Sequence, residues 1–159
     1  MSHKLNLKAT YVHKGTGYPP PHDTPCLERE NTPLGLAAGL TQFGVNLTTL
    51  KPGVWSSQRH WHSDEDEFVW ILEGEVVLVT NEGKETFKAG DCVGFRKGAE
   101  NGHHFINESQ SDAVLLTIGG RSNDDICHYP DIDLQLNPGR YSKPSNFTHK
   151  NGSPYGDAS

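Results

Sequence analysis

The chain contains no block of Lys or Arg and no apolar run long enough to cross a membrane. Its 159 residues include 14 basic and 20 acidic side chains, which gives a formal net charge of -6. We therefore expect neither nucleic acid nor an anionic membrane as a partner. The first ten residues lack the apolar core of a signal peptide, so we expect a soluble cytoplasmic protein.

Cysteine is scarce, and no segment has a helical period longer than about two turns. Cys26, Cys92 and Cys127 lie far apart and form no C-x-x-C pair. This odd and scattered set predicts free thiols in a reducing compartment. The 17 Gly and 10 Pro residues argue against a helical bundle and favour a turn-rich fold.

Short segments with a two-residue apolar period occupy the middle of the chain. Phe43, Val45 and Leu47 alternate with polar neighbours, which is the spacing of a half-buried strand. Further strands are expected at residues 68–73, 76–80, 86–88, 92–95, 105–107 and 113–118. Strands this short, separated by Gly-containing turns, are typical of an all-β sandwich or barrel.

The two ends of the chain differ in composition from this middle part. The triple proline at residues 19–21 cannot lie inside a helix or a central strand. We therefore interpret residues 1–40 as an N-terminal arm that packs on a barrel formed by residues 41–128. Residues 129–159 mix Pro, Gly, Asn and Ser with few apolar side chains, so we interpret them as a C-terminal tail.

A cluster of metal-ligating residue types follows the first expected strand. His60 and His62 are two residues apart, so in an extended segment both imidazoles project from the same face. Glu67 comes after an acidic, turn-prone segment and opens the next strand, where a hairpin would return its carboxylate to the histidines. On geometry alone, Glu65 or Asp66 could be the ligand instead.

A fourth candidate ligand lies some forty residues later. By parity, His103 shares one face of its strand with Phe105 and Asn107, whereas His104 shares the other face with Ile106. One of the two imidazoles must point inward if this strand is covered. We expect the other, His104, to be a surface side chain.

These residues resemble the first motif of the cupin family, in which a Gly, an H-x-H pair, a Glu and a second Gly follow one another. The corresponding residues are Gly53, His60, His62, Glu67 and Gly74. The last two gaps match the motif, and the gap from Gly53 to His60 is one residue longer than usual. The resemblance favours Glu67 over the neighbouring acids.

The second cupin motif contains a Gly, then Pro-x-Gly, a His, and an Asn four residues after the His. This chain offers Gly90, Gly98, His103 and Asn107, with Arg96 at the Pro position. The space between Gly98 and the histidine is longer than the family norm. The spacing to Asn107 favours His103 over its neighbour as the ligand.

The resemblance covers about residues 41–120 and implies a double-stranded β-helix, the jelly-roll barrel of the cupins. It implies that one metal ion is held by His60, His62, Glu67 and His103. Segments 59–62, 102–104 and 128–131 look like a group of small single-domain bacterial cupins. Members of that group are often labelled only as candidate sugar-phosphate isomerases or as uncharacterised cupins, a label that says little about mechanism.

Three imidazoles and one carboxylate form a mixed nitrogen and oxygen donor set. It suits one divalent transition metal, Zn, Fe, Mn, Ni or Co, without selecting among them. Four protein ligands leave positions open for a small-molecule substrate or ligand. Three functions are therefore compatible with the sequence: a sugar-phosphate isomerase-like enzyme, an iron-dependent dioxygenase, and a non-catalytic metal- or small-molecule-binding cupin. No residue stands out as a general acid or base.

A phosphorylated sugar would also need a cationic clamp. Lys51, Arg59, Arg96 and Lys97 flank the motifs and are candidates for it. Arg59 has the opposite parity to His60, so we expect this arginine to face away from the metal.

Alternation from Glu67 onward also predicts an apolar outer face. If the Glu67 carboxylate points into the barrel, then Phe68, Trp70 and Leu72 lie outside. Leaving large apolar side chains exposed costs about 1.5–3 kcal/mol each. The N-terminal arm, a second subunit, or both must cover this row, and we expect a homodimer.

Overall fold

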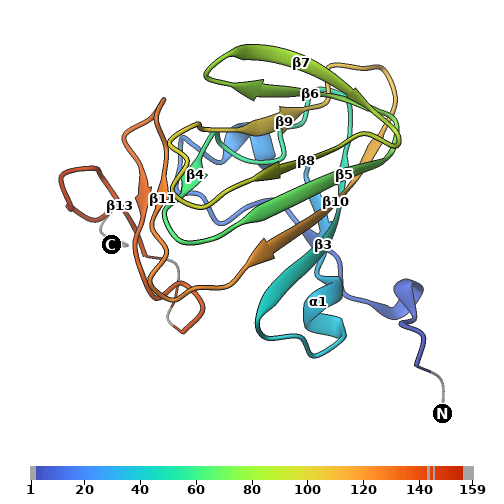
Figure 1. Cartoon of the computed structure of the whole chain (residues 1–159), viewed down its shortest axis with the longest axis horizontal. Coiled ribbons are helices and arrows are strands. Elements are labelled where there is room, and N and C mark those ends of the chain that lie inside the picture. The colour runs from blue at the N-terminus through green and yellow to red at the C-terminus, as the bar shows by residue number, and fades with distance from the viewer. Residues whose placement is uncertain (1–2, 143, 145, 156–159) are drawn as a thin grey trace.

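The computed structural model describes residues 3–142, 144 and 146–155, and most of its regular structure is β. A six-stranded antiparallel sheet forms one wall. In sheet order, its strands are β1 (His13–Lys14), β2 (Glu30–Thr32), β3 (Phe43–Leu50), β10 (Ala113–Gly120), β5 (Glu67–Glu73) and β8 (Cys92–Phe95). One four-residue helix, α1 (Leu34–Ala37), precedes β3 and packs beside it (Figure 1).

Two smaller sheets complete the molecule. One pairs β7 (Gly83–Lys88), β6 (Glu75–Thr80) and β9 (His104–Ile106), and lies across the barrel from β3 and β10 (Figure 1). The other contains β13 (Phe147–Thr148), β12 (Gln135–Leu136), β11 (Cys127–His128) and β4 (Trp61–His62). It stands at the end of the barrel where the C-terminal part of the chain gathers.

The main apolar core lies between the six-stranded and three-stranded sheets. It is formed by buried side chains from both walls: Leu50, Val54, Val69, Ile71, Val76, Leu78, Phe87, Phe105, Ala113 and Leu115. The alternation predicted for β5 is confirmed, because Val69 and Ile71 are buried. The side chains of opposite parity, Phe68, Trp70 and Leu72, are 38%, 45% and 40% exposed.

Glycine is required where the barrel turns most sharply. Gly74 separates β5 from β6 with φ +76°, and a Cβ there would lie 2.5 Å from the carbonyl oxygen of Asp112. Gly83 closes the predicted hairpin between β6 and β7 with φ +121°. Both conformations are open to glycine and strained for other residues.

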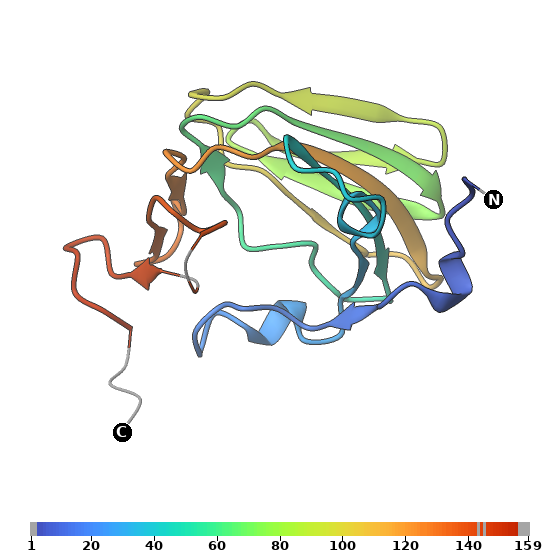
Figure 2. The same ribbon diagram turned by 90° about the horizontal axis from the view of Figure 1, so that it is seen from below.

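The N-terminal segment runs along one side of the barrel (Figure 2). Its short strands β1 and β2 extend the large sheet beyond β3. At the other end, β11 and β12 enclose a second apolar cluster of Cys127, Tyr129, Leu134 and Leu136. No helix within the described residues is long and apolar enough to cross a membrane.

Candidate metal centre

Strand register explains why residues distant in sequence meet at the end of the barrel. His60 lies opposite His103, with backbone N–H···O distances of 3.1 and 2.9 Å in the two directions. His62 lies opposite Cys127, where β4 pairs with β11. Side chains directly opposite each other on antiparallel strands share a face. The H-x-H segment is therefore flanked by one candidate ligand on each side.

The carboxylate of Glu67, from the first position of β5, completes the cluster. Its Oε2 lies 2.8 Å from His103 Nε2 and 3.8 Å from both His60 Nε2 and His62 Nε2. The three imidazoles are buried. The structure thus brings the four predicted ligands to one place, whereas their joint coordination of one ion stays a prediction.

The possible ligand atoms at this end of the barrel form three overlapping groups. Ligand atoms of His60, Glu67 and His103 all lie within 4.8 Å of one another, and His62 forms a similar group with Glu65 and Asp125. The three groups, including that of Cys127 with His60 and His62, consist of buried or half-buried side chains. Buried His, Glu and Cys groups at this end of the barrel can therefore hold a metal ion.

The second ring nitrogen of His60 and that of His62 each have a hydrogen-bond partner. His62 Nδ1 lies 2.7 Å from Asp125 Oδ2, and His60 Nδ1 lies 2.8 Å from the carbonyl oxygen of Gln58. These acceptors assign the ring proton to Nδ1, which leaves the Nε2 lone pairs directed at Glu67. The Nε2 atoms of His60 and His62 are therefore able to act as metal ligands.

Burial also sets the charge state that metal binding needs. Desolvation, helped by the neighbouring imidazoles, lowers the pKa of His60 to about 3. Burial works to raise the pKa of Glu67, but the hydrogen bond with His103 and the nearby imidazoles outweigh it and hold this pKa below its usual range. At neutral pH the cluster therefore offers a neutral imidazole beside an ionised carboxylate.

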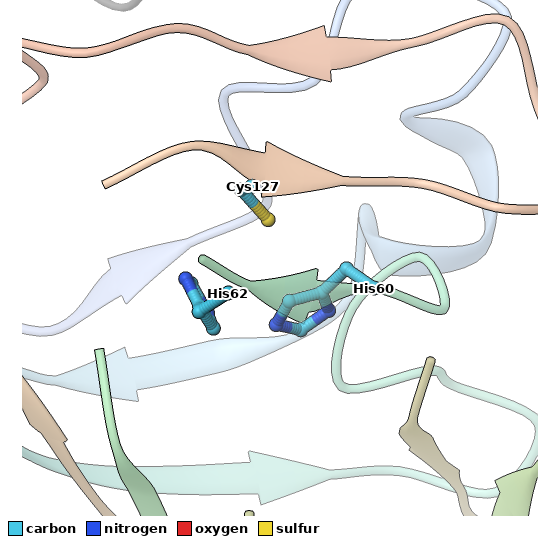
Figure 3. A group of neighbouring side chains, drawn as sticks. All are labelled: His60, His62 and Cys127. Atoms are coloured by element: carbon cyan, nitrogen blue, oxygen red, sulfur yellow. The ribbon is translucent and has the colours of Figure 1, made fainter. Parts of the chain in front are cut away.

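Cys127 was not expected at this site from the sequence. Figure 3 shows its sulfur directed toward the imidazoles of His60 and His62, and all three offer ligand atoms within 4.8 Å of one another. Burial raises the pKa of this thiol to about 12. Cys127 is therefore a neutral thiol at pH 7, and a metal would have to displace its proton to bind sulfur.

A buried charge network supports the cluster from the C-terminal side. Asp125 also accepts a hydrogen bond from the backbone N–H of Asp64 at 2.8 Å. Glu65 accepts hydrogen bonds from the Arg140 guanidinium and from the Tyr141 hydroxyl. Glu65 is therefore engaged in this network, whereas the Glu67 carboxylate faces the imidazoles.

The prediction that His104 is a surface side chain is wrong. It is 5% exposed, and its Nδ1 lies 2.8 Å from the carbonyl oxygen of Ser57. Its ring meets Trp55 edge-on, with 4.7 Å between ring centres. The reason is that the segment from Trp55 to His60 runs antiparallel beside β9, so Trp55 and Ser57 contact the His104 ring.

The four cations that flank the motifs do not form a clamp around the main cavity. Arg59 donates to both carboxylate oxygens of Asp131 at 2.7 Å, facing away from His60 as its parity predicted. Lys97 pairs with Asp64 at 2.8 Å. A smaller, neighbouring cavity has Arg96 in its lining.

The cluster forms part of the wall of a cavity of about 350 Å³. This volume falls in the range of small-molecule sites. Val69, Phe105 and Leu115 supply apolar lining from the core side. The cationic lining comes from residues that the sequence motifs did not mark: Arg29, Arg121 and Arg140.

Comparison with known proteins agrees with this architecture. A family model described as a cupin domain matches residues 46–119. A structure from Silicibacter pomeroyi, described as a sugar phosphate isomerase of the cupin superfamily, is 38% identical, with 96% of each chain covered and a TM-score of 0.91. A candidate sugar phosphate isomerase from Acidithiobacillus ferrooxidans is 29% identical over 82% of this chain and 81% of that one, with a TM-score of 0.71.

The polyketide cyclase RemF from Streptomyces resistomycificus shares the fold, with 16% identity over 76% of this chain and 80% of that one, and a TM-score of 0.59. No curated protein matches the chain in sequence. The chain belongs to the cupin superfamily. The all-β cupin barrel expected from the sequence is thereby confirmed, and its buried His, Glu and Cys cluster is able to bind a metal ion.

Proposed function

We propose that this cupin is a metal-dependent enzyme that isomerises a phosphorylated sugar. The observation that carries the proposal is the convergence of three imidazole Nε2 atoms on Glu67 Oε2 beside a cavity of about 350 Å³. The likeness to a protein from Silicibacter pomeroyi described as a sugar phosphate isomerase supports this choice of reaction. The metal is one of Zn, Fe, Mn, Ni and Co.

A divalent ion held by His60, His62, Glu67 and His103 would polarise a carbonyl or a pair of hydroxyl groups on the sugar. The chain itself orients the ligands. Asp125 fixes the ring of His62 through Nδ1. The ring of His103 stacks on Phe95, with 3.5 Å between ring centres. His103 Nε2 and Glu67 Oε2 are 2.8 Å apart, so a metal ion held by both would replace the proton between them.

Elemental analysis of protein purified without chelator tests the metal. The wild type is expected to hold close to one equivalent, and His60→Ala and His103→Ala are expected to lose most of it, because each removes one nitrogen donor. His13→Ala, at an exposed position of β1, is the matched control and should retain the metal. Equal metal content in all four proteins would remove the proposed centre.

Activity is tested separately, with aldose and ketose phosphates incubated with the metal-loaded protein and analysed by proton NMR in deuterated water. The proposal expects interconversion, with deuterium entering at the carbon that loses its proton. Protein that holds metal but converts none of the aldose–ketose phosphate pairs would contradict the catalytic part. Oxygen consumption with any of these substrates would point to dioxygenase chemistry instead.

A further inference from the structure

Two glycines on neighbouring strands lie between the candidate metal centre and an arginine of the cavity lining. Gly44 of β3 lies directly opposite Gly119 of β10, and both residues line the cavity. Side chains at such paired positions would project from the same face of the sheet. At both positions, an added Cβ would meet neighbouring atoms only at ordinary contact distances, 3.5 Å or more.

Three nitrogen atoms border the space beside Gly44. A Cβ at this position would lie 3.5 Å from Asn46 Nδ2 and 3.8 Å from both Nε and Nη2 of Arg121. Gly44 is not among the glycines with positive φ, so its backbone conformation does not demand glycine. What the missing side chain provides is room beside three N–H donors.

The contacts that hold Arg121 leave its Nε and Nη2 atoms available to a ligand. Its Nη1 donates to the carbonyl oxygen of Leu40 at 3.1 Å, and its guanidinium carbon lies 5.8 Å from the centre of the Tyr141 ring. Nε and Nη2 form the fork that binds two oxygens of one phosphate or carboxylate. Within the described part of the chain, no carboxylate pairs with Arg121, although other arginines have such partners.

Arg29, a second arginine that lines the cavity, is also held by backbone carbonyl groups. Arg29 donates to the carbonyl oxygens of Ser56 and Gly15 at 2.6 and 3.1 Å, and its Nε is buried without a hydrogen-bond partner. No described carboxylate forms an ion pair with it. Two half-buried guanidinium groups at one cavity thus lack a carboxylate partner among the described residues.

The formal charge of the cavity lining becomes positive when a divalent metal ion is counted. The lining contains three arginines, Arg29, Arg121 and Arg140, and three acids, Glu65, Asp66 and Glu67. The formal sum is zero with neutral histidines, and a divalent ion would make it +2. A dianion such as a phosphate monoester compensates this charge.

We propose that Arg121, Asn46 and the space beside Gly44 form a phosphate-binding subsite for a phosphorylated small molecule. The rest of the ligand then extends past Gly119, where an added Cβ would lie 3.9 Å from Cγ of Glu67. The inference rests on the proposed function only in that the other end of the bound ligand would lie at the candidate metal centre. The phosphate subsite itself is independent of it.

Isothermal titration calorimetry with inorganic phosphate, on full-length metal-loaded protein, tests this subsite. Arg121→Gln should weaken binding by roughly tenfold or more, because it removes a charge-assisted bidentate contact. Gly44→Ala retains every charge and fills the space with a methyl group in ordinary contact range, so it should weaken binding comparably while the protein stays folded. Lys84→Gln removes one positive charge on an exposed hairpin and should change the affinity less than twofold.

Glucose 6-phosphate and gluconate, titrated in parallel, distinguish the two sources of an oxyanion. Tighter Arg121-dependent binding of gluconate than of the phosphates would overturn the choice of phosphate. Unchanged phosphate affinity in both Arg121→Gln and Gly44→Ala would overturn the subsite, since the anion would then bind at the metal or elsewhere. Arg121-dependent phosphate binding by a wild type that holds no metal would support the subsite while the proposed function fails.

Discussion

Asp125→Asn should weaken metal binding without unfolding the protein. The Asp125 side chain is fully buried, and its two oxygens accept from different donors, Oδ2 from His62 Nδ1 and Oδ1 from the backbone N–H of Asp64. An asparagine has the same shape but only one acceptor oxygen. If that oxygen keeps the Asp64 N–H, the new amide group donates to His62 Nδ1. The ring proton then moves to Nε2, where it blocks coordination.

The expected loss is roughly 10- to 100-fold in metal affinity, the usual effect of removing an outer hydrogen-bond partner of a ligand. This corresponds to about 1.4–2.7 kcal/mol. Competition against a chromophoric chelator measures the affinity, and circular dichroism checks the fold. Asp131→Asn is the matched control, since it makes the same chemical change at an exposed partner of Arg59. A folded Asp125→Asn protein with wild-type affinity would refute the role given to the carboxylate.

Three further outcomes follow from the fold. Gly74→Ala should lower the free energy of unfolding in urea by about 1–3 kcal/mol or more, because φ is +76° and the added Cβ would lie 2.5 Å from the Asp112 carbonyl oxygen; unchanged stability would contradict this geometry. For metal-free protein, that free energy should fall as the pH drops from 6.5 toward 3, because His60, with its pKa lowered to about 3, binds a proton more readily when unfolded; a flat profile in urea titrations at pH 7 and pH 4.5 would exclude it. We propose that the exposed outer row of β5 is a homodimer interface, so Trp70→Glu should convert a dimer into a monomer in sedimentation velocity; a wild-type monomer at micromolar concentration would contradict the proposal.

Local patterns predicted the parts of the fold that depend on alternation. The inward direction of Val69 and Ile71 in β5 and the outward direction of Arg59 followed from a period of two. The turns at Gly74 and Gly83 followed from where the apolar runs break. These features depend only on residues that are close in sequence.

The features that sequence reasoning missed depend on pairings between distant segments. Cys127 reaches the site because β11 pairs with β4, sixty-five residues earlier in the chain, and no local pattern fixes that register. In the structure, Asp125, Cys127 and Tyr129 are buried and alternate with less buried neighbours, which is strand spacing across the boundary that we drew at residue 128 between barrel and tail. His104 was misplaced because Trp55 and Ser57, from a segment distant in sequence that pairs beside β9, contact its ring.

The candidate metal ligands and the cavity cations lie in different parts of the chain, which bears on ligand specificity. The matched cupin region, residues 46–119, contains all four candidate ligands. The cavity cations Arg29, Arg121 and Arg140 lie outside it, as does the supporting carboxylate of Asp125.

If the proposed phosphate subsite is present, a shared barrel supplies the donor set, and segments on either side of it would select the anion that binds. Because the protein from Silicibacter pomeroyi is similar over 96% of the chain, its likeness extends to these flanking segments as well. Similarity that is confined to residues 46–119 does not indicate which small molecule a relative binds. A relative that keeps the histidines but lacks a cation at the position of Arg121 should bind metal without binding phosphate at this site.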